Sequence, residues 1–291
     1  MSGNQSAITK KSKNFTLKQF FYQLLNNMIK HNIGKNAASI SYYLIFSLFP
    51  LLIFISNFMG LLKLDVFSVT EVLKQILPYE VVHIVESYLH YVSDNSSGIL
   101  LWFSLVFSIW FPMRTAKGLM SDVRLAYNLE KPKNPLTYML KQFLYTIIFL
   151  VVIILTIFLS FTGENILGAI KDFLSTNFFR LSEHFIDIWK YFRFVPIAFL
   201  MLVAIGTLYT ASLERKIPFK SMLPGILTAF ILWLVTSAGF TFYVDNFSHY
   251  SIVYGTLGAV MVLLIWLYMT AFVLITGAEI NACLYSLRTE E

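Results

Sequence analysis

The 291-residue chain contains little charge and almost no cysteine. Charged residues make up 13% of it, and 57% is hydrophobic, with a mean hydropathy of +0.68. A soluble domain carries roughly 25% charge, and a water-soluble fold of this composition would expose large apolar patches. The single cysteine, Cys283, excludes an intrachain disulfide and a thiolate metal cluster. The composition therefore indicates a helical protein surrounded by lipid.

Short motifs of enzyme chemistry are also missing from the sequence. It has no HExxH, GxSxG, Walker A or GxGxxG pattern. The five histidines are scattered, and His83, Glu86 and His90 do not have a recognised metal-ligand spacing. Asp122 and Glu130 lie in a basic segment without an obvious acidic partner. We therefore expect no catalytic residues, no metal and no cofactor.

Six apolar stretches satisfy the requirement for a membrane helix, which is roughly 20 residues for a hydrocarbon core of about 30 Å. They lie at about 37–62, 98–113, 139–161, 194–211, 222–244 and 254–282. The second is short, and we expect its helix to continue into the polar segment that follows. Within the third, the almost uniformly apolar stretch 147–159 is typical of a lipid-facing helix. The predicted fold class is an all-α polytopic membrane bundle of six transmembrane helices at 37–282, flanked by residues 1–36 and a tail at 283–291.

Lysine and arginine are concentrated on one side of these spans. Most of the 22 lie in residues 1–36, between the second and third spans, after the fourth span and in the tail. Because positive loops stay in the cytoplasm, both termini are predicted to be cytoplasmic, which requires an even number of spans. Topology and anionic headgroups then explain the net charge of +6. We expect membrane lipids as partners, together with an unknown solute, and no nucleic acid.

Amphipathic helices are predicted outside the spans. Residues 15–29 have apolar side chains at helical spacing between Lys18 and Lys30. Such a helix lies on an anionic leaflet or packs on the bundle, and the sequence leaves both open. The outer loops 64–97 and 162–193 are longer than connectors need and show helical patterns. We favour their capping the bundle over their lying on the outer leaflet.

Polar side chains line up along one face of the first, fifth and sixth spans. Small and hydroxylated residues ordinarily join membrane helices, but three such stripes, two with an interrupting proline, also predict a polar groove of the kind found at transport sites. Glu279 is the acid placed within a predicted span, which indicates function, unless it pairs with Arg215, Lys216 or a basic residue of the N-terminal segment. The residues expected to bind or gate a substrate are Ser39, Tyr42, Tyr43, Ser47, Pro50, Asn57, Pro224, Thr228, Tyr254, Gly258, Tyr268 and Glu279.

Two motifs carry a resemblance to a known family. They are YGTLGAVMVLLIWLY at 254–268, followed by GAEIN at 277–281, and AASISYYLIFSLFP at 37–50. Together with the Pro224-Gly225 step, they resemble the YihY/virulence factor BrkB family over about residues 20 to 285. The resemblance implies a six-helix protein of the bacterial cytoplasmic membrane with a transport role for envelope lipids or small molecules. The family has also carried the label ribonuclease BN.

These observations predict a transporter or lipid-translocating protein for an amphiphilic or anionic solute related to the envelope. Without an ATP-binding motif, active transport would need an ion gradient or a partner. The alternative is a non-transporting envelope scaffold whose outer loops dock another protein. A membrane ribonuclease is the least favoured hypothesis, because nuclease chemistry needs clustered acids and metal ligands or a positioned acid–base pair.

Overall fold

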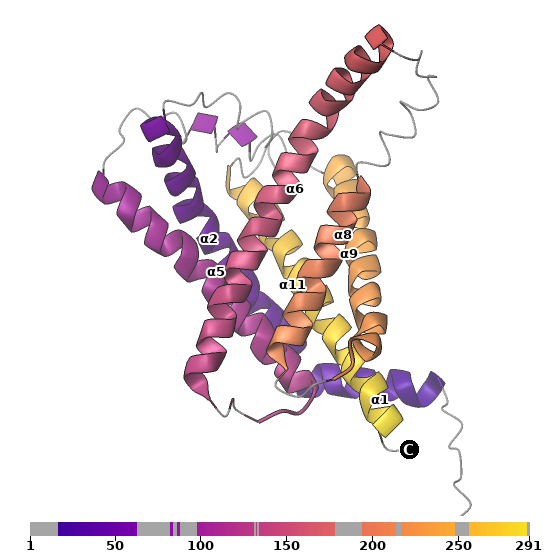
Figure 1. Ribbon diagram of the computed structural model, residues 1–291. Helices are drawn as coiled ribbons and strands as arrows, with labels where there is room; N and C mark the ends of the chain where they lie inside the picture. The colour runs from indigo at the N-terminus through magenta and orange to yellow at the C-terminus, as the bar shows by residue number, and fades with distance from the viewer. Residues whose placement is uncertain are drawn as a thin grey trace, which may run out of the picture.

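Figure 1 shows the computed structural model, whose described part consists of helices and the short turns between them, without a strand. The described residues are 17–62, 82–83, 86–87, 98–130, 132, 134–177, 194–213, 217–247 and 256–289. The helices are α1 (Leu17–Lys30), α2 (Ile33–Leu62), α5 (Gly98–Ala126), α6 (Pro135–Asn177), α8 (Phe194–Ser212), α9 (Phe219–Phe247) and α11 (Thr256–Thr289). The predicted class, an all-α polytopic membrane bundle, is confirmed.

Five of the described helices contain a stretch long and apolar enough to cross a membrane. These stretches are Ile33–Phe54, Pro135–Thr156, Val195–Ser212, Phe219–Val244 and Val260–Leu287. α5 is not among the five, and its apolar part, 98–113, is the shortest of the six stretches predicted from the sequence. The expected continuation of this helix is confirmed, because α5 runs on to Ala126. α5 packs along α2 (Figure 1). The count of six spans remains a prediction, in which α5 would supply the sixth and shortest span.

The bundle is organised around α11, which contacts α1, α2, α5 and α9. Its second half is almost wholly buried, including Ala271, Ala278 and Asn281. By contrast, α6 packs mainly on α8 and α5 and leaves a row of large apolar side chains exposed, among them Ile148, Val151 and Ile154. This exposed apolar row is what the predicted lipid-facing helix would present to the membrane.

A sharp corner joins α1 to α2 and places α1 across one end of the bundle (Figure 1). Asn32 adopts a left-handed conformation with φ of 52°, which asparagine tolerates better than most residues. Next to it, the His31 backbone N–H donates to the Asn27 carbonyl at 2.8 Å, which closes the last turn of α1. α1 therefore meets the C-terminal part of α11, so the first and last described helices adjoin at this end of the bundle.

α1 combines features of both alternatives proposed for it. On one face Leu24 is buried, and the Gln23 amide donates to Ser286 Oγ of α11 at 3.4 Å. On the opposite face large apolar side chains are exposed, including Tyr22 at 76% and Ile29 at 78%. The helix is thus packed on the bundle and still presents an apolar surface of the kind that enters a leaflet.

The outer segments are described only in part. α6 does not end near Phe161, where the third span was placed, but continues to Asn177. The expected helix within 165–174 is therefore present as an extension of α6. Most of the loop 64–97 and all of 178–193 lie outside the described residues, and so do the amphipathic hairpins predicted there.

Candidate functional site

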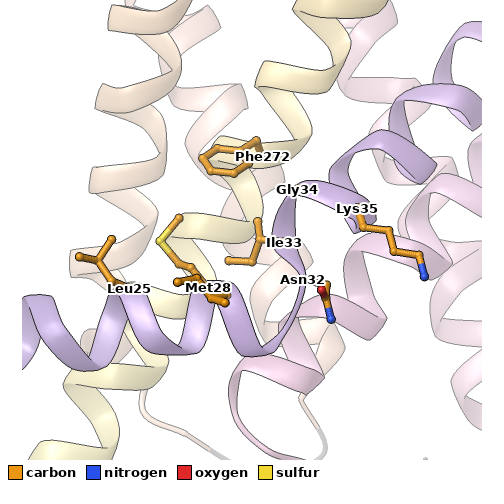
Figure 2. A pocket seen from close by; sticks show the side chains of 8 residues that line it. Leu25, Met28, Asn32, Ile33, Gly34, Lys35 and Phe272 are labelled. Atoms are coloured by element: carbon orange, nitrogen blue, oxygen red, sulfur yellow. The ribbon is translucent and has the colours of Figure 1, made fainter.

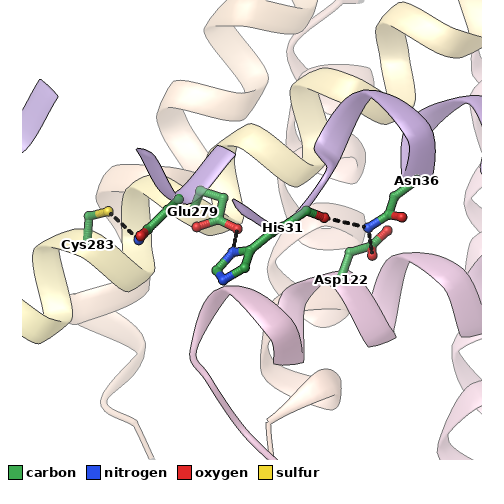
Figure 3. Close-up of polar contacts among 6 residues, drawn as sticks. His31, Asn36, Asp122, Glu279 and Cys283 are labelled. Carbon is green, nitrogen blue, oxygen red and sulfur yellow. Dashed lines mark hydrogen bonds and ion pairs between the residues drawn. The ribbon is translucent and has the colours of Figure 1, made fainter. Parts of the chain in front are cut away.

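A fully buried carboxylate lies where α11 meets the α1–α2 corner (Figure 3). Glu279 Oε1 is 2.6 Å from Nδ1 of His31, which is itself buried. The second carboxylate oxygen, Oε2, is also buried and has no hydrogen-bond partner among the described residues. Burying a charge is costly unless it is paired, which explains the ion pair but leaves one oxygen of the carboxylate unsatisfied. Glu279 thus points into the protein and pairs with the N-terminal segment.

A second carboxyl group is linked to this pair through an asparagine. Asn36 Nδ2 donates to the His31 carbonyl at 3.1 Å and to Asp122 Oδ1 at 2.7 Å (Figure 3). Asp122 lies in α5 beyond its apolar part, and burial raises its pKa to about 7. The hydrogen bond from Asn36 lowers that pKa, and the negative charge of Glu279 raises it further. We call His31, Asn36, Asp122 and Glu279 the polar cluster; it joins the α1–α2 corner, α5 and α11.

α9 packs closely on α11, and this packing positions Glu279. Two residues of the GAEIN motif at 277–281 make the close contact possible. A Cβ atom on Gly277 would lie 2.5 Å from the Tyr209 hydroxyl and 2.6 Å from Ala229 Cβ, so only glycine fits there without rearrangement. Asn281 holds α9 with two buried hydrogen bonds: its Oδ1 accepts from the Gly225 backbone N–H, and its Nδ2 donates to the Met222 carbonyl, both at 2.7 Å. The motif therefore brings two helix backbones together and leaves Glu279 facing the polar cluster.

The predicted proline interruptions are not found. Pro50 and Pro224 lie inside α2 and α9, and both helices continue past them. A proline removes one backbone hydrogen bond. Beside Pro224, the Asn281 side-chain amide hydrogen-bonds the Gly225 backbone N–H and the Met222 carbonyl, on either side of the proline ring.

Two hydroxyls of the predicted stripes bond within their own helices. Ser47 Oγ donates to the Leu44 carbonyl at 2.5 Å, and Thr228 Oγ1 donates to the Pro224 carbonyl at 2.7 Å. The exposure of the remaining predicted residues varies: Ser39 and Tyr42 are exposed, Tyr43, Pro50, Pro224 and Tyr268 are half-buried, and Gly258 is buried. Tyr254 and the side chain of Asn57 lie outside the described part of the chain. Of the residues predicted to bind or gate, Glu279 is the one that the structure brings into the polar cluster.

Sequence reasoning missed the other three members of the cluster. His31 is one of five scattered histidines, Asp122 lies in a basic segment without an obvious acidic partner, and no motif marks Asn36. His31 and Glu279 are 248 positions apart, so spacing could not connect them. The signal that the sequence did offer is Glu279 itself, because an acid in an apolar span requires a charged or hydrogen-bonding partner elsewhere in the chain.

An open groove lies beside the polar cluster (Figure 2). Its volume is about 470 Å³, and its walls come from α1, the start of α2 and Phe272 of α11. The lining residues are Leu25, Met28, Ile29, Asn32, Ile33, Gly34, Lys35 and Phe272. This groove lies at the α1–α2 corner, apart from the place among the first, fifth and sixth spans where a polar groove was predicted.

One basic residue of the predicted cytoplasmic side has a structural role. Arg124 is buried, and its guanidinium donates to the Ser212 carbonyl at 3.3 Å and to the Glu130 carbonyl. It also lies 5.2 Å from the ring centroid of Tyr138, a cation–π distance. In the described part of the chain, no three His, Cys, Asp or Glu residues form a group that could hold a metal ion.

Comparison with known proteins gives the family. The model of the family described as virulence factor BrkB matches residues 24–291. The putative ribonuclease-like protein YfkH of Bacillus subtilis is 29% identical over 91% of this chain and 95% of its own length. Shorter matches include the UPF0761 membrane protein PSHAa0171 of Pseudoalteromonas translucida, 34% identical over 28% of each chain, and a UPF0761 membrane protein of Vibrio cholerae, 30% identical over 32% of this chain and 31% of that one. No solved structure matches. The chain is a multi-pass membrane protein, consistent with the bacterial cell membrane, and belongs to the virulence factor BrkB family.

Proposed function

We propose that this protein moves an amphiphilic or anionic solute of the envelope, a lipid among them, across the cytoplasmic membrane. The observation that carries the proposal is the buried Glu279–His31 pair in a bundle whose outer surface is apolar. Ionisable groups inside membrane bundles are costly and mark substrate, ion or proton pathways. Packing alone would be served better by apolar side chains of similar volume.

The position of the polar cluster suits a coupling role. It contacts three elements at once, namely the α1–α2 corner, α5 and α11. A change in the charge of one member therefore alters contacts on all three, which is how a local electrostatic event moves packed helices. Since the sequence has no ATP-binding motif, a proton is the simplest coupling ion that such groups can bind.

The test is a lipid-movement assay on the full chain in phosphatidylglycerol-containing vesicles. The vesicles contain a fluorescent phosphatidylglycerol probe. A membrane-impermeant reductant quenches the fluorescence of probe molecules that reach the outer leaflet, and the rate of quenching measures their movement. We expect the probe to move faster than in protein-free vesicles, with a large loss of rate in Glu279→Gln and a loss of rate in Tyr43→Ala. Glu130→Gln should leave the rate unchanged, because Glu130 is an exposed acid outside the polar cluster. Unchanged rates in Glu279→Gln and Tyr43→Ala would remove the proposed site.

A scaffold function is the second candidate, and the length of α6 favours it. This helix continues to Asn177, well past its apolar part, and rises beyond its neighbours in Figure 1. Such an extension gives another envelope protein a surface to dock on. The scaffold predicts that deleting 162–177 abolishes the cellular phenotype of the protein while Glu279→Gln is silent; the transport proposal predicts loss of function in Glu279→Gln.

The Bacillus subtilis relative is named a putative ribonuclease-like protein. We expect no ribonuclease activity in this chain, because the two acids of the basic segment between the second and third spans, Asp122 and Glu130, have no obvious acidic partner of the kind that nuclease chemistry requires. Purified protein that cuts RNA, and stops doing so in Asp122→Asn or Glu130→Gln, would establish the enzyme instead.

A further inference from the structure

The groove at the α1–α2 corner has two chemically different sides. Leu25, Met28 and Ile29 of α1 form an apolar wall, and Phe272 of α11 lies above it (Figure 2). On the α2 side the groove is lined by Asn32 and Lys35, both exposed. A ligand that matches this lining has an apolar chain and an anionic or hydrogen-bonding head.

The surroundings of the groove share one charge sign. Residues 17–36 contain Lys18, Lys30 and Lys35 and no acid. The two acids of the adjoining polar cluster, Asp122 and Glu279, are buried. Juxtamembrane lysines attract anionic headgroups, each contributing about 1 kcal/mol, or roughly fivefold in binding. Charge complementarity therefore selects a negatively charged partner.

The orientation of α1 places this groove beside the exposed apolar face that we expect to enter the leaflet. α1 lies across the end of the bundle, and the apolar side chains of its outer face, including Leu25 and Ile29, are more than half exposed. These two residues also line the groove, so the groove opens onto the same surface that enters the leaflet. A volume of about 470 Å³ lies within the usual range for ligand sites, about 300–1,000 Å³.

We infer that the groove binds one anionic phospholipid of the cytoplasmic leaflet. Its phosphate lies against Lys35 and Asn32, and part of one acyl chain lies against Leu25, Met28 and Phe272. Asn32, Ile33 and Gly34 line the groove and follow His31 directly in the chain. The bound lipid therefore stabilises the α1–α2 corner, which holds His31 against Glu279. This inference goes beyond the proposed function and holds whether or not the protein moves a solute.

Lipid binding is measured on the full chain in detergent by native mass spectrometry. The probes are dioleoyl-phosphatidylglycerol and dioleoyl-phosphatidylcholine, which share their acyl chains and differ in net charge. We expect the wild-type chain to bind phosphatidylglycerol at least about fivefold more tightly. Lys35→Gln should remove this preference, and Leu25→Ser should weaken the binding of both lipids.

The matched control is Lys220→Gln, which removes an exposed lysine on the same predicted side but at the start of α9. It should leave the preference unchanged. Equal affinity of the wild-type chain for the two lipids, or equal losses in Lys35→Gln and Lys220→Gln, would overturn the inference. Because binding is read without any transport step, such a result would leave the vesicle assay of the proposed function standing, and a failed vesicle assay would leave the lipid site standing.

Discussion

Replacing Gly277 with alanine tests the close contact of α9 with α11. The added Cβ would lie 2.5 Å from the Tyr209 hydroxyl, 2.6 Å from Ala229 Cβ and 2.8 Å from the Gly225 carbonyl. All three distances are far below ordinary van der Waals contact. The Tyr209 hydroxyl cannot retreat freely, because it donates to the Leu274 carbonyl at 2.6 Å.

The expected cost follows from three contributions. Overpacking a well-packed core costs about 1–3 kcal/mol, and breaking the tyrosine hydrogen bond adds about 1 kcal/mol. The intrinsic preference of a helix for alanine over glycine returns up to about 1 kcal/mol. Gly277→Ala should therefore lower the free energy of unfolding by about 1–3 kcal/mol.

Gly239 supplies the control, because a Cβ there meets nothing within 4 Å. Gly239→Ala keeps the helix-propensity gain without the clash and should stabilise the protein by about 0.5–1 kcal/mol. Thermal unfolding of both variants in detergent, followed by tryptophan fluorescence, measures the difference. If Gly277→Ala melts at or above Gly239→Ala, the close approach of the two helices is refuted.

Three further outcomes are expected. Asn281→Leu removes two buried hydrogen bonds between α11 and the α9 backbone and should cost about 1–3 kcal/mol, whereas Thr241→Ala, on the exposed face of α9, should melt within a degree or two of the wild-type chain. Burial raises the pKa of Asp122 from 3.8 to about 7, so the folded protein holds this proton more tightly than the unfolded chain. The contribution of Asp122 to stability should therefore be fully present below pH 3.8 and be lost, up to about 4 kcal/mol, as pH rises through 7; a melting profile that declines equally in Asp122→Asn would contradict this. A spin label on Tyr22→Cys in a Cys283→Ala background should be accessible to a lipid-soluble relaxing agent in vesicles; access only to a water-soluble agent would show that α1 does not enter the leaflet.

Much of the helical architecture is readable from local pattern. The apolar periodicity of residues 15–29 predicts α1, and the apolar stretch 147–159 predicts the exposed apolar surface of α6. These predictions succeed because hydrophobic spacing within one helix decides which face avoids water or meets lipid. Helix ends were less predictable: α6 continues to Asn177, since an amphipathic extension has no local signal that separates it from the span before it.

The candidate site depended on contacts that no local pattern encodes. The sequence singled out Glu279 as an acid in an apolar span, and the structure supplied its partner, His31. Asn281 was part of a motif whose purpose became visible only when its amide was seen to bond α9. Its role depends on a neighbour 56 positions away, Gly225.

Composition and hydrophobic spacing were sufficient to establish a lipid-embedded helical bundle and its basic end, because the cost of exposing apolar surface or burying charge is set residue by residue. Packing at Gly277, Asn281 and the Asn32 corner decided which helices are in contact. It thereby also decided which polar groups surround the buried Glu279. Those contacts join segments distant in the chain, and their energies exist only once the backbone has brought the segments together.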